Sequence, residues 1–431
     1  MKKPVQRPSP KQPTDVHQAV MREFRKAPAI ILGNLVYKKL AGQGVDLSDE
    51  DAQAFAERIL RGDSNAYVLD DGLDAHRDLT LTLTEEDVAN LEEAIKQFAE
   101  KISDLISSLC SKSAADLLRY LKREWPSQFI YQSSMNADFR ERLEDHWGSA
   151  LHGLRMMRTI CGEIGEEFHK KLVRSKSSRD RALRSVLILL HARSCQIVSE
   201  LIVLLENGFA DGAMARWRTL YEIGVVAAVI VDGGEQLAQK YLDHDAVESK
   251  LALDKYNECC AALGFRPLSK RERQYVDREF QAAITKYGVE FGRPFGWATS
   301  HLREKRVTFA DLENAAKQSH MRTYYKMASY NIHADIKGLT HRLGVIGDEF
   351  VVLAGASNAG HAEPGQGAAI ALTRITGLLF YRDISNFDTM VKLSMLNLLR
   401  DQIVSTFASA ERALKRKHRD YVRGKGSKLR K

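Results

Sequence analysis

Residues 180–231 read DRALRSVLILLHARSCQIVSELIVLLENGFADGAMARWRTLYEIGVVAAVIV, and this stretch decides the fold. It holds two apolar runs, 180–205 and 213–231, each long enough for several helical turns. The turn residues Asn207 and Gly208 lie between them, with Gly212 behind. Two helices joined by a short loop are antiparallel neighbours. We therefore predict an antiparallel helical pair at the centre of the protein.

The rest of the chain favours helices as well. It shows no internal repeat and no alternation of strands with helices, so the predicted fold class is all-α, a helical bundle. Single cores stop growing near roughly 250 to 300 residues, and this chain has 431, of which 44% are hydrophobic. We expect two helical lobes with disordered basic termini. The predicted parts are a disordered arm (1–15), an N-terminal lobe (16–175), a central bundle (176–411) and a basic tail (412–431).

The most regular apolar spacing lies in the N-terminal lobe. Gaps of three and four residues alternate along a seam that predicts a helix with acidic residues at its start, formed by Val88, Leu91, Ile95, Phe98, Ile102, Leu105 and Leu109. This seam fits either a dimerising coiled coil or an intramolecular hairpin with Leu117, Leu118 and Leu121. Because three heptads are near the minimum for a free-standing coiled coil, we favour a hairpin over 84–123 with its turn at 111–113. The alternative, a dimerising coiled coil, predicts a homo-oligomer.

Charge is concentrated at the two ends. The formal net charge is +8, yet 412–431 alone holds ten Lys or Arg against Asp420, a balance of +9. Such density attracts phosphate backbones, although blocks of like charge also serve only as solvated tails. The tail therefore supplies our candidates for binding nucleic acid, namely Lys415, Arg416, Lys417, Arg419 and Arg423.

Cysteine usage and hydropathy address the compartment. Five cysteines without a CxxC pair fit a reducing cytoplasm. The apolar runs are interrupted by charge or are shorter than the roughly 20 residues that span a bilayer. We expect a cytoplasmic protein without a membrane partner.

Two helices carry the candidate chemistry. The stretch 322–334 predicts a helix in which Tyr325, Ser329 and His333 recur at every fourth residue, with Arg322 one turn earlier. In the second helix of the central pair, Arg218 and Glu222 are also four residues apart, in an apolar setting where a carboxylate must be paired. These groups form either a buried hydrogen-bond network or the wall of an active site. The catalytic candidates are Arg218, Glu222, Ser329 and His333, and the supporting ones are Arg322, Tyr325 and His244.

Cofactor motifs are lacking. No HExxH or comparable spacing supports a metal, and no metal site is predicted. The run 355–367 has four glycines and Pro364 but not the order of a phosphate-binding loop, and it is predicted to be a flexible connection. We predict no cofactor.

The run from Glu206 to Glu222, a His-containing helix about twenty residues later, and the run Tyr325-Lys-Met-Ala-Ser329-Tyr-Asn-Ile-His333 together resemble a bacterial family of unknown function, number 5677. The resemblance covers roughly 180–344. It implies a helical domain and no particular reaction. The N-terminal lobe and the basic tail lie outside it.

The sequence is also similar to the HEPN ribonucleases, helical domains with an Arg followed after four to six residues by His. Matching pairs are Arg140 with His146, Arg184 with His191, and Arg412 with His418, about as many as this composition produces by chance. The ten residues between Arg322 and His333 lie outside that pattern.

Two function hypotheses follow from these features. One is a hydrolytic, nuclease-like effector, such as in bacterial defence, with His333 as base. The other is a non-enzymatic binding or scaffold protein whose Arg, Glu, Ser and His groups are structural.

Overall fold

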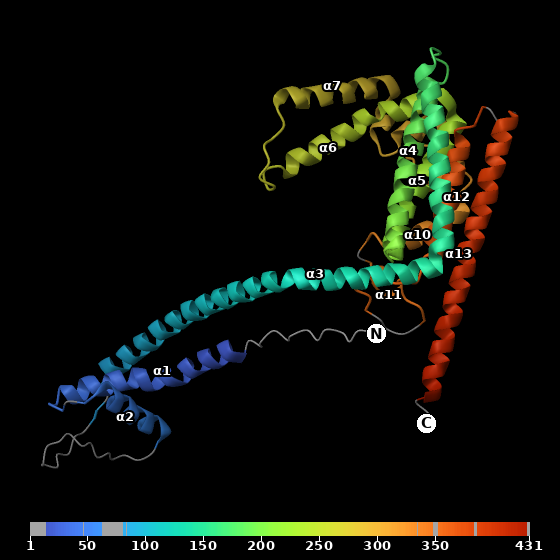
Figure 1. The fold of residues 1–431 in the computed structure, drawn as a ribbon. Coiled ribbons are helices and arrows are strands. Elements are labelled where there is room, and N and C mark those ends of the chain that lie inside the picture. The colour runs from blue at the N-terminus through green and yellow to red at the C-terminus, as the bar shows by residue number, and fades with distance from the viewer. Residues whose placement is uncertain are drawn as a thin grey trace. The chain divides into compact units, whose positions relative to one another are not determined.

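The computed structural model describes residues 14–428 except 46, 63–80, 83, 334, 348–351 and 383–385 (Figure 1). Within these residues every regular element is a helix and no strand occurs, which confirms the all-α fold class. The chain forms two compact units, Met1–Gln132 and Ser133–Lys431. Each unit is described by itself below.

The first unit holds α1 (Thr14–Ala41), α2 (Asp49–Arg61) and the start of α3 (Glu85–Arg174). Its small core lies between α1 and α2 and is formed by Val36, Leu40, Val45 and Leu47. Ser48 accepts a hydrogen bond from the Asp51 amide and so caps α2. The predicted arm lies outside the described residues except for its last two positions, which already belong to α1.

Helix α3 corrects the predicted hairpin. It runs without a turn for 90 residues and contributes to both units. Residues 111–113 are helical, and the helix also continues through Pro126. Leu117 and Leu121 therefore lie farther along the helix instead of on a returning one. The side chains of Ile102, Leu105 and Leu109 are outside the description. The units divide inside α3, not near the predicted lobe boundary at 175.

The second unit is a bundle of long helices (Figure 1). It is built from the C-terminal part of α3 with α4 (Arg181–Glu206), α5 (Ala210–Asp243), α12 (Ala362–Leu378) and α13 (Phe387–Lys428). Helix α12 packs against α4, α5 and α13. The largest fully buried side chains include Trp147, Leu151, Leu201 and Phe407, so the core joins all these helices.

Shorter elements lie between α5 and α12 along the chain. They are α6 (Asp245–Cys259), α7 (Lys270–Tyr287), η1 (Val289–Gly292), η2 (Gly296–Ala298), α8 (Thr299–Leu302), α9 (Phe309–Ala315), η3 (Ser319–Met321), α10 (Arg322–Tyr330) and α11 (Ile336–Thr340). Helices α9 and α10 contact α5 directly. This contact positions the candidate site.

The predicted pair of central helices is confirmed as α4 and α5. Gly208 in their connecting turn has φ = 79°, a conformation that favours glycine. The Glu235 carboxylate accepts hydrogen bonds from the Ala182 and Leu183 amides at 2.9 Å each and so satisfies the start of α4. By length and composition alone, α4 is the one described helix able to cross a membrane, but half of its apolar window is buried in the bundle, as in other core helices.

The C-terminal part of the chain differs from the prediction at two points. Gly365 and Gly367 belong to α12. A Cβ added to Gly365 would lie 2.3 Å from the Phe407 ring, and one added to Gly367 would lie 2.4 Å from the Trp217 indole nitrogen. These glycines serve close helix packing and not a flexible connection. The basic tail is helical up to Lys428, so its predicted disorder is wrong for 412–428. Residues 429–431 lie outside the described part.

Candidate functional site

A polar network centred on Tyr325 joins α10 to α5. The Tyr325 hydroxyl donates to Glu222 Oε1 at 2.7 Å and accepts from Arg218 Nη2 at 2.7 Å. Arg218 and Glu222 also pair directly at 3.1 Å, one helical turn apart. The Arg218 guanidinium lies 4.7 Å from the centre of the Tyr325 ring. Of the predicted site residues, the structure therefore brings Arg218, Glu222 and Tyr325 together, and their predicted catalytic and supporting roles stay predictions.

A second network lies beside the first and is centred on Glu313 of α9. Its carboxylate is 2% exposed and pairs with Arg322 of α10. The Tyr221 hydroxyl donates to Glu313 Oε1 at 2.9 Å and is also within 3.1 Å of the Gln318 carbonyl oxygen. Tyr221 and Tyr325 are in ring contact at 5.8 Å, so the two networks are neighbours. Together they attach α9, η3 and α10 to α5.

The electrostatics keep both phenols protonated. Burial raises the pKa of Tyr325; the hydrogen bond from Arg218 opposes this shift, and the one to Glu222 adds to it. Burial and the Glu313 carboxylate raise the pKa of Tyr221. Each tyrosine therefore acts as a hydrogen-bond donor to a carboxylate. A neutral phenol between charged partners suits a stable network better than proton abstraction.

Ser329 and His333 are placed outside this network. The Ser329 hydroxyl donates to the Tyr325 carbonyl oxygen of its own helix at 2.9 Å. The predicted helix over 322–334 is too long, because α10 ends at Tyr330 and the next residues form turns. His333 is exposed beyond that end, and its imidazole has no hydrogen-bond partner among the described side chains. The predicted face of Tyr325, Ser329 and His333 is therefore not formed.

His244 lies elsewhere, at the junction of α5 and α6. It is buried, and its Nε2 is 3.1 Å from the Arg293 carbonyl oxygen. Its Nδ1 is 3.6 Å from Glu248, and its ring packs edge-on against Phe291. These partners differ from those of Tyr325, so the structure does not bring His244 to the candidate site. Nor does the described part of the chain contain a group of three or more His, Cys, Asp or Glu able to hold a metal ion.

The basic candidates of the tail lie on the last turns of α13. Lys415 pairs with Glu411 at 2.7 Å. Arg416, Lys417, Arg419 and Arg423 are exposed and pair with no carboxylate among the described residues.

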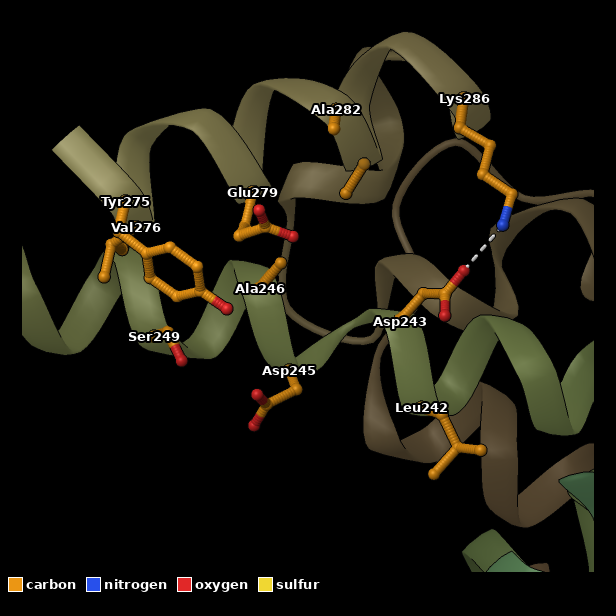
Figure 2. Close-up of a pocket in the computed structure, with 11 residues that line it drawn as sticks. Leu242, Asp243, Asp245, Ala246, Ser249, Tyr275, Val276, Glu279, Ala282 and Lys286 are labelled. Atoms are coloured by element: carbon orange, nitrogen blue, oxygen red, sulfur yellow. Dashed lines mark hydrogen bonds and ion pairs between the residues drawn. The ribbon is translucent and has the colours of Figure 1, made fainter.

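A separate cavity of about 400 Å³ lies between α6 and α7 (Figure 2). Lys286 reaches from α7 to Asp243 and pairs with it at 2.8 Å, and Tyr287 donates to the same carboxylate at 2.6 Å. Burial alone would raise the pKa of Asp243, but hydrogen bonds from Lys286, Tyr287 and Gln239 hold it below its ordinary value. A carboxylate stabilised as an anion in this way is a poor proton acceptor, and the lining includes none of the predicted site residues.

The sequence analysis did not identify three polar side chains of this region. Tyr221 and Glu313 form the second network, and Arg374 of α12 donates to the Ala316 carbonyl oxygen at 2.9 Å. Burial lowers the pKa of Arg374. The capping residues Thr308 and Asp311 indicate where α9 starts, but no spacing relates Glu313 to a tyrosine 92 residues earlier.

The comparisons with known proteins give one match, to a family model. No curated protein and no solved structure matches the chain. The family model that matches covers residues 184–350, which is less than half of the chain but includes α5, α9 and α10. The resemblance predicted for roughly 180–344 is thereby confirmed. Residues 184–350 match the family of unknown function DUF5677.

Proposed function

We propose that this chain is a non-enzymatic protein that binds nucleic acid through the C-terminal end of α13, residues 412–428. The observation that carries the proposal is a row of exposed arginines on one face of that helix: Arg412, Arg416, Arg419 and Arg423. Spacings of four, three and four residues keep side chains on the same side of an α-helix. The row therefore presents four guanidinium groups in one direction.

The chemistry of this row fits a phosphate backbone. Arginine offers a planar fork of donors that binds phosphate at two points, and it stays charged at any physiological pH. Successive arginines here are separated by roughly 4.5 to 6 Å along the helix axis, at 1.5 Å per residue. Lys417 adds a fifth exposed cation nearby. We expect binding without sequence preference and with a steep dependence on salt.

The rest of α13 holds this row on a fixed platform. The Phe407 side chain is fully buried in the core and packs against Trp147, and Gln366 of α12 donates to the Val404 carbonyl oxygen. The row begins shortly after Phe407 on the same helix. A rigid helix loses less conformational entropy on binding than a disordered tail does.

The Tyr325 network supports a structural role over a catalytic one. Arg218 Nη2, the Tyr325 hydroxyl and Glu222 Oε1 bond to one another, whereas the buried Arg218 Nε has no hydrogen-bond partner among the described residues, and Ser329 and His333 do not join the network. A nucleophile needs an adjacent base. Among the described residues, neither the Ser329 hydroxyl nor the Tyr325 hydroxyl bonds to an imidazole. The DUF5677-like segment then acts as the scaffold that carries α13.

The test is fluorescence anisotropy with labelled single-stranded RNA and duplex DNA. For the wild type, the logarithm of the affinity should fall linearly with the logarithm of salt between about 50 and about 200 mM. Each phosphate contact contributes about 0.7 to 0.9 to the salt slope. Changing the four arginines to glutamine should therefore reduce that slope by roughly 3 and weaken binding at least tenfold.

A matched control removes the same charge elsewhere. The exposed residues Arg266, Lys270, Arg271 and Arg273, at and before the start of α7, are changed to glutamine together. This variant should retain nearly the wild-type slope. Equal losses in both variants would mean that only net charge matters. Cleavage of the RNA that Glu222→Gln abolishes would replace the proposal by the hydrolytic hypothesis.

A further inference from the structure

Helix α3 exposes an apolar face in the first unit. Val88, Ile95, Ile106, Leu117 and Leu121 have between 37% and 56% of their surface accessible to solvent. Trp125, Phe129 and Ile130 continue the exposure toward the end of the unit, at 55%, 58% and 70%. A row of exposed large apolar side chains along one helix is a candidate interaction surface.

Val88, Ile95, Ile106 and Leu117 share one line along the helix; Leu121 lies about 60° from it, and Trp125, Phe129 and Ile130 lie about 100° or more from it. Ile95, Ile106 and Leu117 are evenly spaced, each close to three helical turns from the next, and Val88 lies five turns before Ile106. Between 93 and 123, every residue within about 60° of this line is uncharged, at about 100° per residue. Glu92 and Glu124 lie within the same 60° just beyond these limits, so the part of the stripe between 93 and 123 is the part that can be covered without burying a charge.

The stripe has a symmetric centre at Ile106. This residue is the midpoint of the sequence between Ile95 and Leu117, and it is also the midpoint between Leu91 and Leu121. If two copies of α3 pair in opposite directions with Ile106 against Ile106, Ile95 faces Leu117 and Leu91 faces Leu121. A two-fold contact of this kind requires a self-complementary surface.

The charges select the antiparallel direction. Residues 85–104 contain seven acidic residues against two lysines, a balance of −5, whereas residues 108–127 contain four basic residues against two acidic ones, a balance of +2. In an antiparallel pair centred at Ile106, the acidic residues 85–104 of each copy lie against the basic residues 108–127 of the other copy. A parallel pair would place the two acidic halves together at a distance near the Debye length of about 8 to 10 Å, where repulsion is strong.

We infer that two copies of this chain associate through an antiparallel pair of α3 helices centred at Ile106. This inference does not depend on the proposed binding of nucleic acid. Its consequence is a dimer with two DUF5677-like segments and two arginine rows.

The first experiment measures the mass of the full-length chain by light scattering at micromolar concentration. We expect twice the chain mass for the wild type and one chain mass for Ile106→Glu, because this change places two carboxylates together at the two-fold centre. The control, Ala115→Glu, adds the same charge to an exposed position on the opposite side of the helix and should remain dimeric. Circular dichroism checks that both variants keep their helical content. A monomeric wild type, or an Ile106→Glu variant that stays dimeric, would overturn the inference.

Cysteine cross-linking then tests the direction of the pair. Cys110 is exposed and is first replaced by serine. In that background, Ile95→Cys alone and Leu117→Cys alone should not form cross-linked dimers, whereas a mixture of the two should, because the antiparallel register places 95 against 117. Disulfides need Cα atoms within about 7 Å, which excludes other pairs in this register. Self-cross-linking of each single variant would show a parallel pair and contradict the assignment.

Discussion

The Tyr325 network and the end of α13 differ in whether their charged side chains have partners. In this network and the neighbouring Glu313 network, Arg218 and Arg322 each have a carboxylate partner, and Tyr325 and Tyr221 each donate to a carboxylate. On α13, Arg416, Arg419 and Arg423 face solvent without such a partner among the described residues. The DUF5677-like segment carries the paired set, and the helix end outside it carries the exposed one.

The difference separates charges that maintain a fold from charges available to a ligand. A buried pair is costly to break, because the partner left behind stays desolvated. An exposed cation contributes little to stability, but it can still neutralise a phosphate. Substitutions in the two regions should therefore have opposite effects on stability and binding.

The largest effect on stability should come from Glu313→Ala. Removing this 2% exposed carboxylate leaves the Arg322 guanidinium without its carboxylate partner and the Tyr221 hydroxyl with the Gln318 carbonyl oxygen alone. We expect a loss of about 3 to 5 kcal/mol in the free energy of unfolding, measured by urea denaturation. Glu304→Ala changes an exposed glutamate in the same region and should stay within about 0.5 kcal/mol. If the two variants are equally stable, the Glu313 network does not hold α9 to α5.

Lowering the pH should reduce the free energy of unfolding of the second unit, because the buried His191 imidazole would have to bind a proton. This imidazole is buried beside Thr376, and burial lowers its pKa from 6.5 to about 4. As the pH falls, His191 is protonated in the unfolded chain near pH 6.5 but in the folded chain only near pH 4. Its full contribution to the free energy of unfolding is therefore present above about pH 6.5. It is lost as the pH falls toward 4, by up to about 3 kcal/mol. Urea denaturation at pH 7 and at pH 4.5 should show a smaller difference for His191→Gln than for the wild type. An unchanged difference would mean that His191 is not the group that titrates.

Tyr325→Phe should have a smaller effect. The change removes one hydroxyl, whereas Arg218 and Glu222 keep their own contact at 3.1 Å. We expect a loss of about 2 kcal/mol, because the hydroxyl's two hydrogen bonds, from Arg218 and to Glu222, both involve charged groups. The thermal unfolding midpoint provides the measurement. A loss as large as that of Glu313→Ala would show that the two networks act as one unit.

The smallest effect on stability should come from Arg419→Gln. This side chain is exposed, so its removal should change the free energy of unfolding by less than about 0.5 kcal/mol. The same variant should lower the salt slope of RNA binding by about 1. Stable protein with an unchanged slope would remove Arg419 from the proposed contact.

Local patterns in the sequence predicted the parts of the fold that depend on near neighbours. The apolar runs predict α4 and α5, and the pair Arg218 and Glu222 follows from their spacing within one helix. Tyr325 was placed correctly because its helix also begins at Arg322. The exposure of the basic residues of α13 agrees with their charge density, although the helix itself was not expected.

The errors arose where distant residues decide the structure. His333 was placed on a helix that ends at Tyr330, because a spacing of four residues does not reveal where a helix stops. The hairpin assumed that an apolar seam must be covered within one chain, yet α3 leaves Leu117 and Leu121 exposed. Glu313 was missed because its partners lie in other helices.

The central claim is tested most directly by comparing the RNA affinity of two variants by fluorescence anisotropy. One is Tyr325→Phe, and the other changes Arg412, Arg416, Arg419 and Arg423 to glutamine. We predict that Tyr325→Phe binds RNA like the wild type and that the arginine variant loses affinity at least tenfold, with a shallower salt dependence. Binding that is lost in Tyr325→Phe and retained in the arginine variant would contradict the account and place the ligand site at the Tyr325 network.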